Sequence, residues 1–112
     1  WTAHASGSAD PSVFDLVGPD DSMIYVQVPR RIPPLEQMVA DGQELFERGK
    51  YAAGDWITVR YTHDGHLYCQ RHVVVRKEKL TAVVTLQCRM DSMLLAAPTH
   101  EFVANALKPG QE

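Results

Sequence analysis

The chain has 112 residues, which is enough for one domain with one hydrophobic core and too few for two. Its 45% hydrophobic and 22% charged residues are ordinary for a folded globular protein and exclude disorder throughout. Its formal net charge of -3 lacks the basic excess that binding to a phosphate backbone needs, so we expect no nucleic-acid partner. No apolar run approaches the roughly 20 residues of a membrane-spanning helix, and any signal peptide or lipid anchor would lie upstream of Trp1.

Residues 1–12 are mostly small or polar and predict a lead-in loop. The two apolar runs that follow, 13–17 and 23–28, are separated by Gly-Pro-Asp-Asp-Ser, a cluster that favours turns. The second run has the period of two that a half-buried strand shows. We therefore expect a β-hairpin.

Residues 29–34 contain three prolines and so cannot form a central strand. They predict an exposed basic loop, in which Arg30 and Arg31 could meet an acidic partner. Pro34 fits the first turn of a helix, apolar residues recur after it at helical spacing, and a glycine follows where the helix should stop. We therefore expect a helix over residues 34–48.

Three runs rich in β-branched and aromatic residues, 56–62, 67–77 and 81–89, follow one another with turn-forming breaks between them. Short connections of this kind join antiparallel neighbours. We therefore expect a three-stranded meander, against which the rest of the chain packs.

The end of the chain predicts a second helix. Asp91, Ser92 and Pro98 precede its helical pattern, and Pro109 ends it. The apolar residues that share one side of it are Leu95, Phe102, Val103, Ala106 and Leu107. The sequence thus predicts an α+β fold, in which an antiparallel β-sheet (hairpin plus three-stranded meander) is flanked by two helices in the order β-β-α-β-β-β-α. Residues 1–112 would form a single α/β sandwich domain.

The connection at residues 63–66 decides which side chains share a face, because a slip of one residue moves every side chain to the other face. A two-residue turn at its Asp-Gly pair would mix Trp56 and Arg60 with the apolar residues of the next strand, which makes a poor core. A three-residue loop instead pairs Thr62 with His66 and gathers the apolar residues on one face, so we expect this bulged hairpin. The packed face would hold Ile57, Val59, Tyr61, Leu67, Cys69, Val73, Val75, Ala82, Val84, Leu86 and Cys88.

The opposite sheet face is a candidate binding surface. In the same register Trp56 opposes His72, and Arg60 opposes Tyr68. Tryptophan, tyrosine and arginine are enriched at binding hot spots, whereas the alternative is that the last helix covers this face. Arg71 would point inward at the rim, with its charged head in solvent. The candidate binding residues are Trp56, Arg60, Tyr68, His72, Arg30 and Arg31.

The second connection of the meander bears on the two cysteines. If residues 78 and 79 form a two-residue turn, counting back along both strands puts Cys69 directly opposite Cys88. Opposed residues lie within reach of disulfide geometry, and a disulfide there would indicate an oxidising compartment. The alternative is a pair of reduced core cysteines.

No arrangement of residues predicts an active site. His63, Asp64 and His66 share one tight hairpin and could hold zinc, but Asp64 has a turn role and His72 lies too far along the next strand to join them. No serine or threonine occupies a strained nucleophile turn. We therefore expect no catalytic residue, no metal and no cofactor.

The order of these elements resembles the α/β sandwich superfamily that includes the PsbP proteins of photosystem II and the bacterial DcrB-like proteins. The resemblance is carried by VFDLVGPDDSMIYVQVP for the hairpin, LEQMVADGQELFERG for the helix, GDWITVRYTHDGHLYCQRHVVVRKEKLTAVVTLQC for the meander and APTHEFVANALKP for the closing helix. Trp1 would be the tryptophan that ends a preceding strand, so the resemblance implies an upstream strand that this chain lacks. It also implies a binding or assembly accessory without a catalytic centre.

The sequence thus favours a non-enzymatic accessory domain, periplasmic or otherwise extracytoplasmic, that binds another protein through its sheet face or basic loop. A second hypothesis is an immunity protein or a secretion-system chaperone or adaptor that occludes a toxin or effector. A third is a small metal-dependent enzyme centred on His63 and His66. The alternative location is the cytoplasm.

Overall fold

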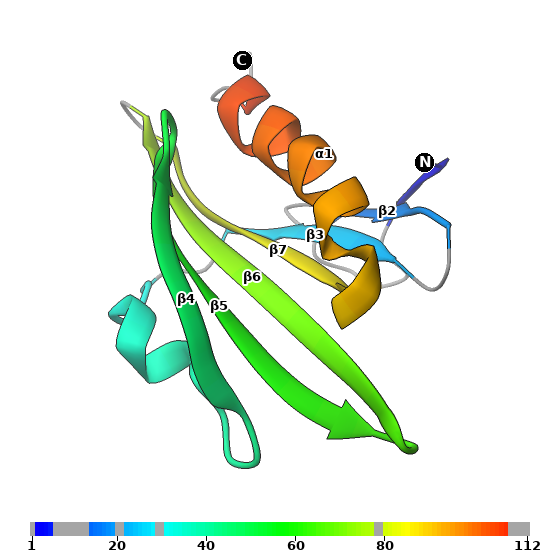
Figure 1. Cartoon of the computed structure of the whole chain (residues 1–112). Coiled ribbons are helices and arrows are strands. Elements are labelled where there is room, and N and C mark those ends of the chain that lie inside the picture. The colour runs from blue at the N-terminus through cyan, green and yellow to red at the C-terminus, as the bar shows by residue number, and fades with distance from the viewer. Residues whose placement is uncertain (1, 6–13, 20–21, 29–30, 78–79, 108–112) are drawn as a thin grey trace.

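The computed structural model describes residues 2–5, 14–19, 22–28, 31–77 and 80–107. Within these ranges a seven-stranded antiparallel sheet runs in the order β1-β2-β3-β7-β6-β5-β4, and one α-helix lies across one of its faces (Figure 1). The predicted α+β class is confirmed, whereas the predicted two-helix order is not found. No helix of the described ranges is long and apolar enough to cross a bilayer. The elements are β1 (Thr2–Ala5), β2 (Phe14–Val17), β3 (Met23–Gln27), the 3-10 turn η1 (Leu35–Met38), β4 (Glu44–Tyr51), β5 (Gly54–His63), β6 (His66–Lys77), β7 (Leu80–Arg89), the 3-10 turn η2 (Met90–Ser92) and α1 (Met93–Ala106).

The predicted meander and hairpin are both present. Strands β5, β6 and β7 pair in sequence, and β2 pairs with β3, which joins the meander through β7. The predicted lead-in loop is wrong for residues 2–5, which form β1 beside β2. An open strand edge offers backbone partners to any extended segment. Trp1 and residues 6–13 lie outside the described ranges.

The helix predicted over residues 34–48 is wrong. The short turn η1 is followed by a turn at Gly42 and then by the edge strand β4. Gly42 has a φ of 83°, a left-handed conformation that interrupts a helix. Gly49, which was expected to stop the helix, lies inside β4, where an added Cβ would overlap the Trp56 ring. This glycine is therefore a packing site in a strand.

The hairpin between β5 and β6 uses the two-residue turn, so the predicted bulged register is wrong. His63 pairs with His66. Asp64 and Gly65 have φ values of 51° and 78°, and positive φ at both central residues is the requirement of a type I′ turn. An Asp-Gly pair meets that requirement at little cost, and the twist of this turn matches that of the strands.

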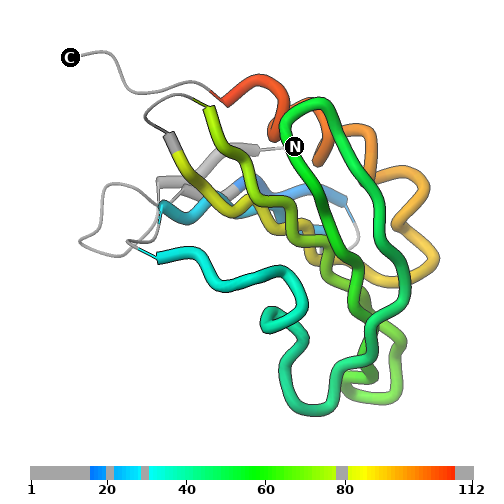
Figure 2. The backbone as a smooth tube through the Cα atoms, turned by 90° about the vertical axis from the view of Figure 1, so that its left-hand side faces the viewer, coloured from blue at the N-terminus to red at the C-terminus, as the bar shows by residue number. Residues whose placement is uncertain are grey.

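Both faces of the sheet are covered, so the expectation of a single packed face is wrong. Helix α1 contacts β7, β6 and β4, whereas η1 contacts β5 and β6, and residues 31–43 lie on the other side of the strands from α1 (Figure 2). Ile57 and Val59 are fully buried on the η1 side. Trp56 opposes Val73 on the α1 side, so each face has its own buried set.

Helix α1 turns a different side to the sheet than predicted. It contains Pro98 rather than following it. The expected apolar side is wrong for Leu95, Phe102 and Ala106, which are exposed, whereas Val103 and Leu107 pack against the core as expected. Two of its inward residues are alanines, which let the helix backbone approach the strands closely. The buried residues of α1 are Met93, Ala96, His100 and Ala104.

Replacing Gly49 by alanine should destabilise the domain. The added methyl group would overlap the Trp56 ring, and overpacking of this kind costs about 1–3 kcal/mol. Urea unfolding measures the loss. In a Trp56→Leu background the same glycine change should cost clearly less, and an equal cost in both backgrounds would contradict the packing that we describe.

Candidate binding surfaces

The four residues predicted to share an open sheet face do not lie together. Trp56 and Arg60 are on the α1 side of the sheet. Tyr68 and His72 are on the η1 side. Trp56 packs against the hydrophobic core, and Arg60 Nε donates to Glu44 at 3.1 Å. The predicted pairs are therefore wrong, and the sheet face that they would have formed is divided.

The two residues on the η1 side are engaged within the domain. The Tyr68 ring stacks on Tyr61 with 5.9 Å between the ring centres. His72 Nδ1 lies 2.8 Å from the Thr85 hydroxyl oxygen, and burial lowers the pKa of His72 to about 4. This histidine is therefore neutral at pH 7.

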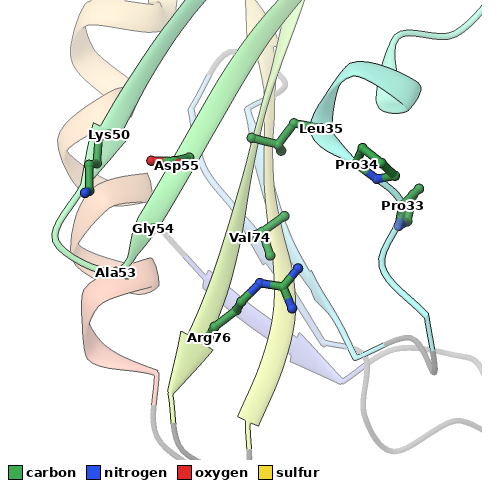
Figure 3. A pocket seen from close by; sticks show the side chains of 9 residues that line it. All are labelled: Pro33, Pro34, Leu35, Lys50, Ala53, Gly54, Asp55, Val74 and Arg76. Atoms are coloured by element: carbon green, nitrogen blue, oxygen red, sulfur yellow. The ribbon is translucent and has the colours of Figure 1, made fainter.

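The basic loop leads to a recess on the η1 side. Arg30 lies outside the described residues, and Arg31 is exposed. Beyond it a recess of about 380 Å³ opens between the loop and strands β4 to β6 (Figure 3). Arg76 extends from β6 toward the loop, and neither it nor Lys50 forms an ion pair with another described residue. The recess is lined by Pro33, Pro34, Leu35, Lys50, Ala53, Gly54, Asp55, Val74 and Arg76.

A buried polar cluster lies on the opposite side of the sheet, between β4, β6 and α1. His100 Nε2 lies 2.9 Å from the Val84 carbonyl oxygen, to which it donates as an N–H. Its Nδ1 is then an acceptor for the Tyr51 hydroxyl at 3.0 Å. The Tyr51 oxygen in turn accepts from Arg71 Nη1 at 3.2 Å. One hydroxyl group thus connects all three elements.

Arg71 is a member of this cluster and not a rim residue, so that prediction is wrong. Arg71 is only 8% exposed. Its Nε donates to the Thr58 hydroxyl at 2.8 Å, and its guanidinium lies 3.7 Å from the centre of the Trp56 ring. Its Nη2 is 3.7 Å from the Glu47 carboxylate, which is half exposed. A buried charge is tolerated only with such partners, and here the neighbouring strands supply them.

Burial fixes the protonation of the cluster. It lowers the pKa of His100 to about 4 and raises that of Tyr51, so both groups are neutral at pH 7. A neutral imidazole has one N–H and one lone pair, as the two contacts of His100 require. The cluster therefore carries its charge on Arg71 alone.

A second recess, which we call the α1 recess, opens beside the polar cluster and has a volume of about 300 Å³. Strand β4, strand β6 and the first half of α1 contribute its walls. Arg71 and Tyr51 belong to the cluster behind it, and two carboxylates, those of Glu47 and Glu101, also line it. The lining residues are Glu47, Tyr51, Arg71, Met93, Leu94, Ala97, Pro98 and Glu101.

The outward side of α1 carries an apolar stripe that sequence reasoning missed. Leu94, Leu95 and Phe102 are 88%, 82% and 72% exposed. Pro98 is exposed between them, and we call these four residues the outer stripe. A signal for it was present: Met93 and the two leucines after it are consecutive, and three consecutive helical residues cannot all face the sheet.

The predicted opposition of Cys69 and Cys88 is confirmed, and the two thiols are free in this structure. Their sulfur atoms are 3.6 Å apart, and both residues are fully buried. The contact with Cys88, together with burial, raises the pKa of the Cys69 thiol. A protonated, buried thiol is a poor nucleophile, so the pair has a packing role in this state.

The turn histidines do not gather a metal-ligand set. His63 Nε2 lies 3.4 Å from the Asp64 carboxylate, and both side chains are largely exposed. Within the described parts of the chain, no group of three His, Cys, Asp or Glu side chains is close enough to hold a metal ion.

Changing Tyr51 to phenylalanine should destabilise the domain by about 1–3 kcal/mol, because His100 loses its hydrogen-bond donor and Arg71 loses an acceptor in a buried site. Urea unfolding measures this. Tyr68→Phe is the matched control and should stay within about 0.5 kcal/mol of the parent. Equal effects of the two changes would show that the Tyr51 hydroxyl does not hold the cluster.

Stability should fall as the pH drops from 7 to 5. Burial lowers the pKa of His72 and His100 to about 4, so the unfolded chain binds protons below pH 6.5 that the folded chain does not. The contribution of these two neutral histidines to the free energy of unfolding is therefore complete above pH 6.5 and decreases toward pH 4. At pH 5 the free energy of unfolding should be lower by about 2 kcal/mol per histidine.

Urea unfolding at pH 5, 6 and 7 checks this dependence. His100→Gln should flatten the profile, whereas Leu67→Ser, which removes no ionisable group from an exposed position, should leave its slope unchanged. A profile of the parent protein that is flat between pH 5 and 7 would contradict the buried, neutral state of both histidines.

The comparisons with known proteins identify a fold and no family. No protein-family model and no curated protein matches the chain. A Pseudomonas aeruginosa protein of unknown function, PA94, has a similar structure, with a TM-score of 0.57 and 14% identity over 89% of this chain and 83% of PA94. LpqN, a Mycobacterium tuberculosis protein involved in cell envelope biogenesis, gives a TM-score of 0.39 and 11% identity over 87% of this chain and 64% of LpqN. The likeness to PA94 shows the fold alone.

Proposed function

We propose that this chain is a non-enzymatic, extracytoplasmic accessory domain, and that it binds another protein through the outer stripe of α1. One observation carries the proposal: Leu94, Leu95 and Phe102 are 88%, 82% and 72% exposed on a single helix. Scattered surface apolar residues are normal, but a contiguous apolar patch with a polar border marks an interaction site. The resemblance to the PsbP-like and DcrB-like proteins implies the same kind of accessory role.

The helix offers the stripe as a rigid surface. Leu95 and Phe102 are seven residues apart and so lie on the same side of the helix. The C-terminal end of α1 is fixed to the sheet, because Lys77 Nζ donates to the Leu107 carbonyl at 2.8 Å and Asn105 Oδ1 accepts from a backbone N–H of the β4–β5 turn at 3.0 Å. A partner that docks here meets a preorganised surface, which lowers the entropic cost of binding.

The border of the stripe is polar. Glu101 and Asn105 are exposed beside it toward the C-terminal end, and Asp91 is exposed at the other end. An apolar centre with a polar rim is the usual anatomy of a protein interface. An immunity protein or a secretion-system chaperone that occludes its partner would need a surface of the same kind.

The extracytoplasmic part of the proposal rests on the cysteine pair. Cys69 and Cys88 are directly opposed with 3.6 Å between their sulfur atoms, so a small adjustment would allow a disulfide in an oxidising compartment. Thiol counting on the denatured protein from its native host tests this part: no free thiol supports an extracytoplasmic location, and two free thiols contradict it.

The binding function is tested by comparative capture from native extract. The double change Leu95→Ser, Phe102→Ser should abolish capture of the partner without loss of stability, since both side chains are exposed. Leu67→Ser is the matched control, because Leu67 is 46% exposed on β6 and lies outside the stripe. Quantitative mass spectrometry of the captured proteins should show a partner that binds the parent and the control equally. A partner retained by the double variant would sink the proposal.

A further inference from the structure

We infer that the partner presents a basic side chain, lysine or arginine, next to its apolar docking residues, and that this side chain enters the α1 recess. The inference rests on the proposed function, because the recess adjoins the outer stripe. Leu94 and Pro98 belong to both. A segment that docks on the stripe therefore passes the opening of the recess.

The charges at the opening are acidic. Glu47 and Glu101 line the recess and are exposed, whereas Arg71 lies behind them with a side chain that is only 9% exposed. Glu101 lines the same recess as Tyr51 and Arg71, so this carboxylate lies beside the cluster. Burial is the main cause of the raised pKa of Tyr51, and the negative charge of Glu101 adds to it. No ion pair within the described ranges involves Glu101.

Arg71 does not reverse this charge pattern. Its N–H groups are directed to Thr58 and Tyr51, and its flat face lies against the Trp56 ring. It is also 3.7 Å from Glu47, so an incoming anion would compete with a carboxylate that is already present. Two exposed carboxylates against one buried cation leave the opening with a net negative charge.

The walls of the recess suit the rest of a basic side chain. Met93, Leu94, Ala97 and Pro98 form an apolar wall along α1. The aliphatic stems of lysine and arginine pack on such surfaces while the charged head reaches a polar group. Here the head would meet Glu47 and Glu101, and an arginine could bind a carboxylate with two parallel hydrogen bonds.

Peptide phage display on the full chain tests the inference. A random peptide library is selected on the parent protein and depleted on the Leu95→Ser, Phe102→Ser variant, so that stripe-dependent binders are kept. We expect these peptides to carry lysine or arginine beside leucine, phenylalanine or other large apolar residues. Replacing that basic residue by alanine should weaken binding to the parent by about tenfold. The loss should be larger at low salt than at high salt, since salt screens exposed charges.

A double-mutant cycle then assigns the basic residue to the recess. The affinity for the peptide should fall by a similar factor of about ten in the Glu101→Gln variant and in the double variant Glu47→Gln, Glu101→Gln. In these two variants, replacing the basic residue of the peptide by alanine should then change the affinity little. Glu36→Gln is the control for net charge, because Glu36 lies on the η1 side and pairs with Arg48. It should leave the affinity unchanged.

The outcomes separate the two proposals. Stripe-dependent peptides that lack basic residues, or that bind the glutamate variants as tightly as the parent, overturn this inference and leave the proposed function intact. The absence of any stripe-dependent peptide overturns both. Sedimentation that shows a stripe-dependent dimer of this chain makes a second copy the occupant, and it also overturns the inference.

Discussion

The hydroxyl group of Tyr51 is the contact on which the arrangement of the α1 side depends. It donates to His100 of α1 and accepts from Arg71 of β6, while Tyr51 itself ends strand β4. Because His100 also donates to the Val84 carbonyl of β7, the helix is tied to three strands through one imidazole and one phenol. The rotation of α1 about its own axis is set by these contacts, and the outer stripe faces solvent as a result.

The buried polar cluster fixes the orientation of α1 more than it adds stability. Replacing a buried charged group by apolar residues is often neutral or stabilising, so Arg71 is not evidence of high stability. What the cluster supplies is a single orientation of the helix, since each hydrogen bond has one matching partner. Ala96 and Ala104 fit this geometry, because larger inward side chains would lift α1 off the sheet. The proposed function follows from the orientation, because a helix held this way presents the outer stripe to solvent as a fixed surface.

Much of the strand pattern was predictable, and the failures have local causes. The meander and the opposition of Cys69 and Cys88 followed from turn lengths and periods of two. The register at the Asp-Gly turn did not, because gathering the apolar residues on one face is the right criterion only for a sheet with one packed face, and here α1 and the η1 segment bury both faces. The helix expected over residues 34–48 is not formed, because Gly42 has a left-handed conformation and Gly49 lies in a strand against the Trp56 ring. Long-range packing of this kind leaves no local signal.

The central claim is that α1 turns Met93, Ala96, His100 and Ala104 to the sheet and leaves the outer stripe exposed in the free domain. Hydroxyl-radical footprinting of the dilute protein tests it residue by residue. Leu95 and Phe102 should be oxidised at rates close to those of the unfolded chain, while Met93, chemically more reactive, should be protected by burial. Protection of Leu95 and Phe102 together with rapid oxidation of Met93 would contradict the orientation of the helix, and with it the proposed binding surface.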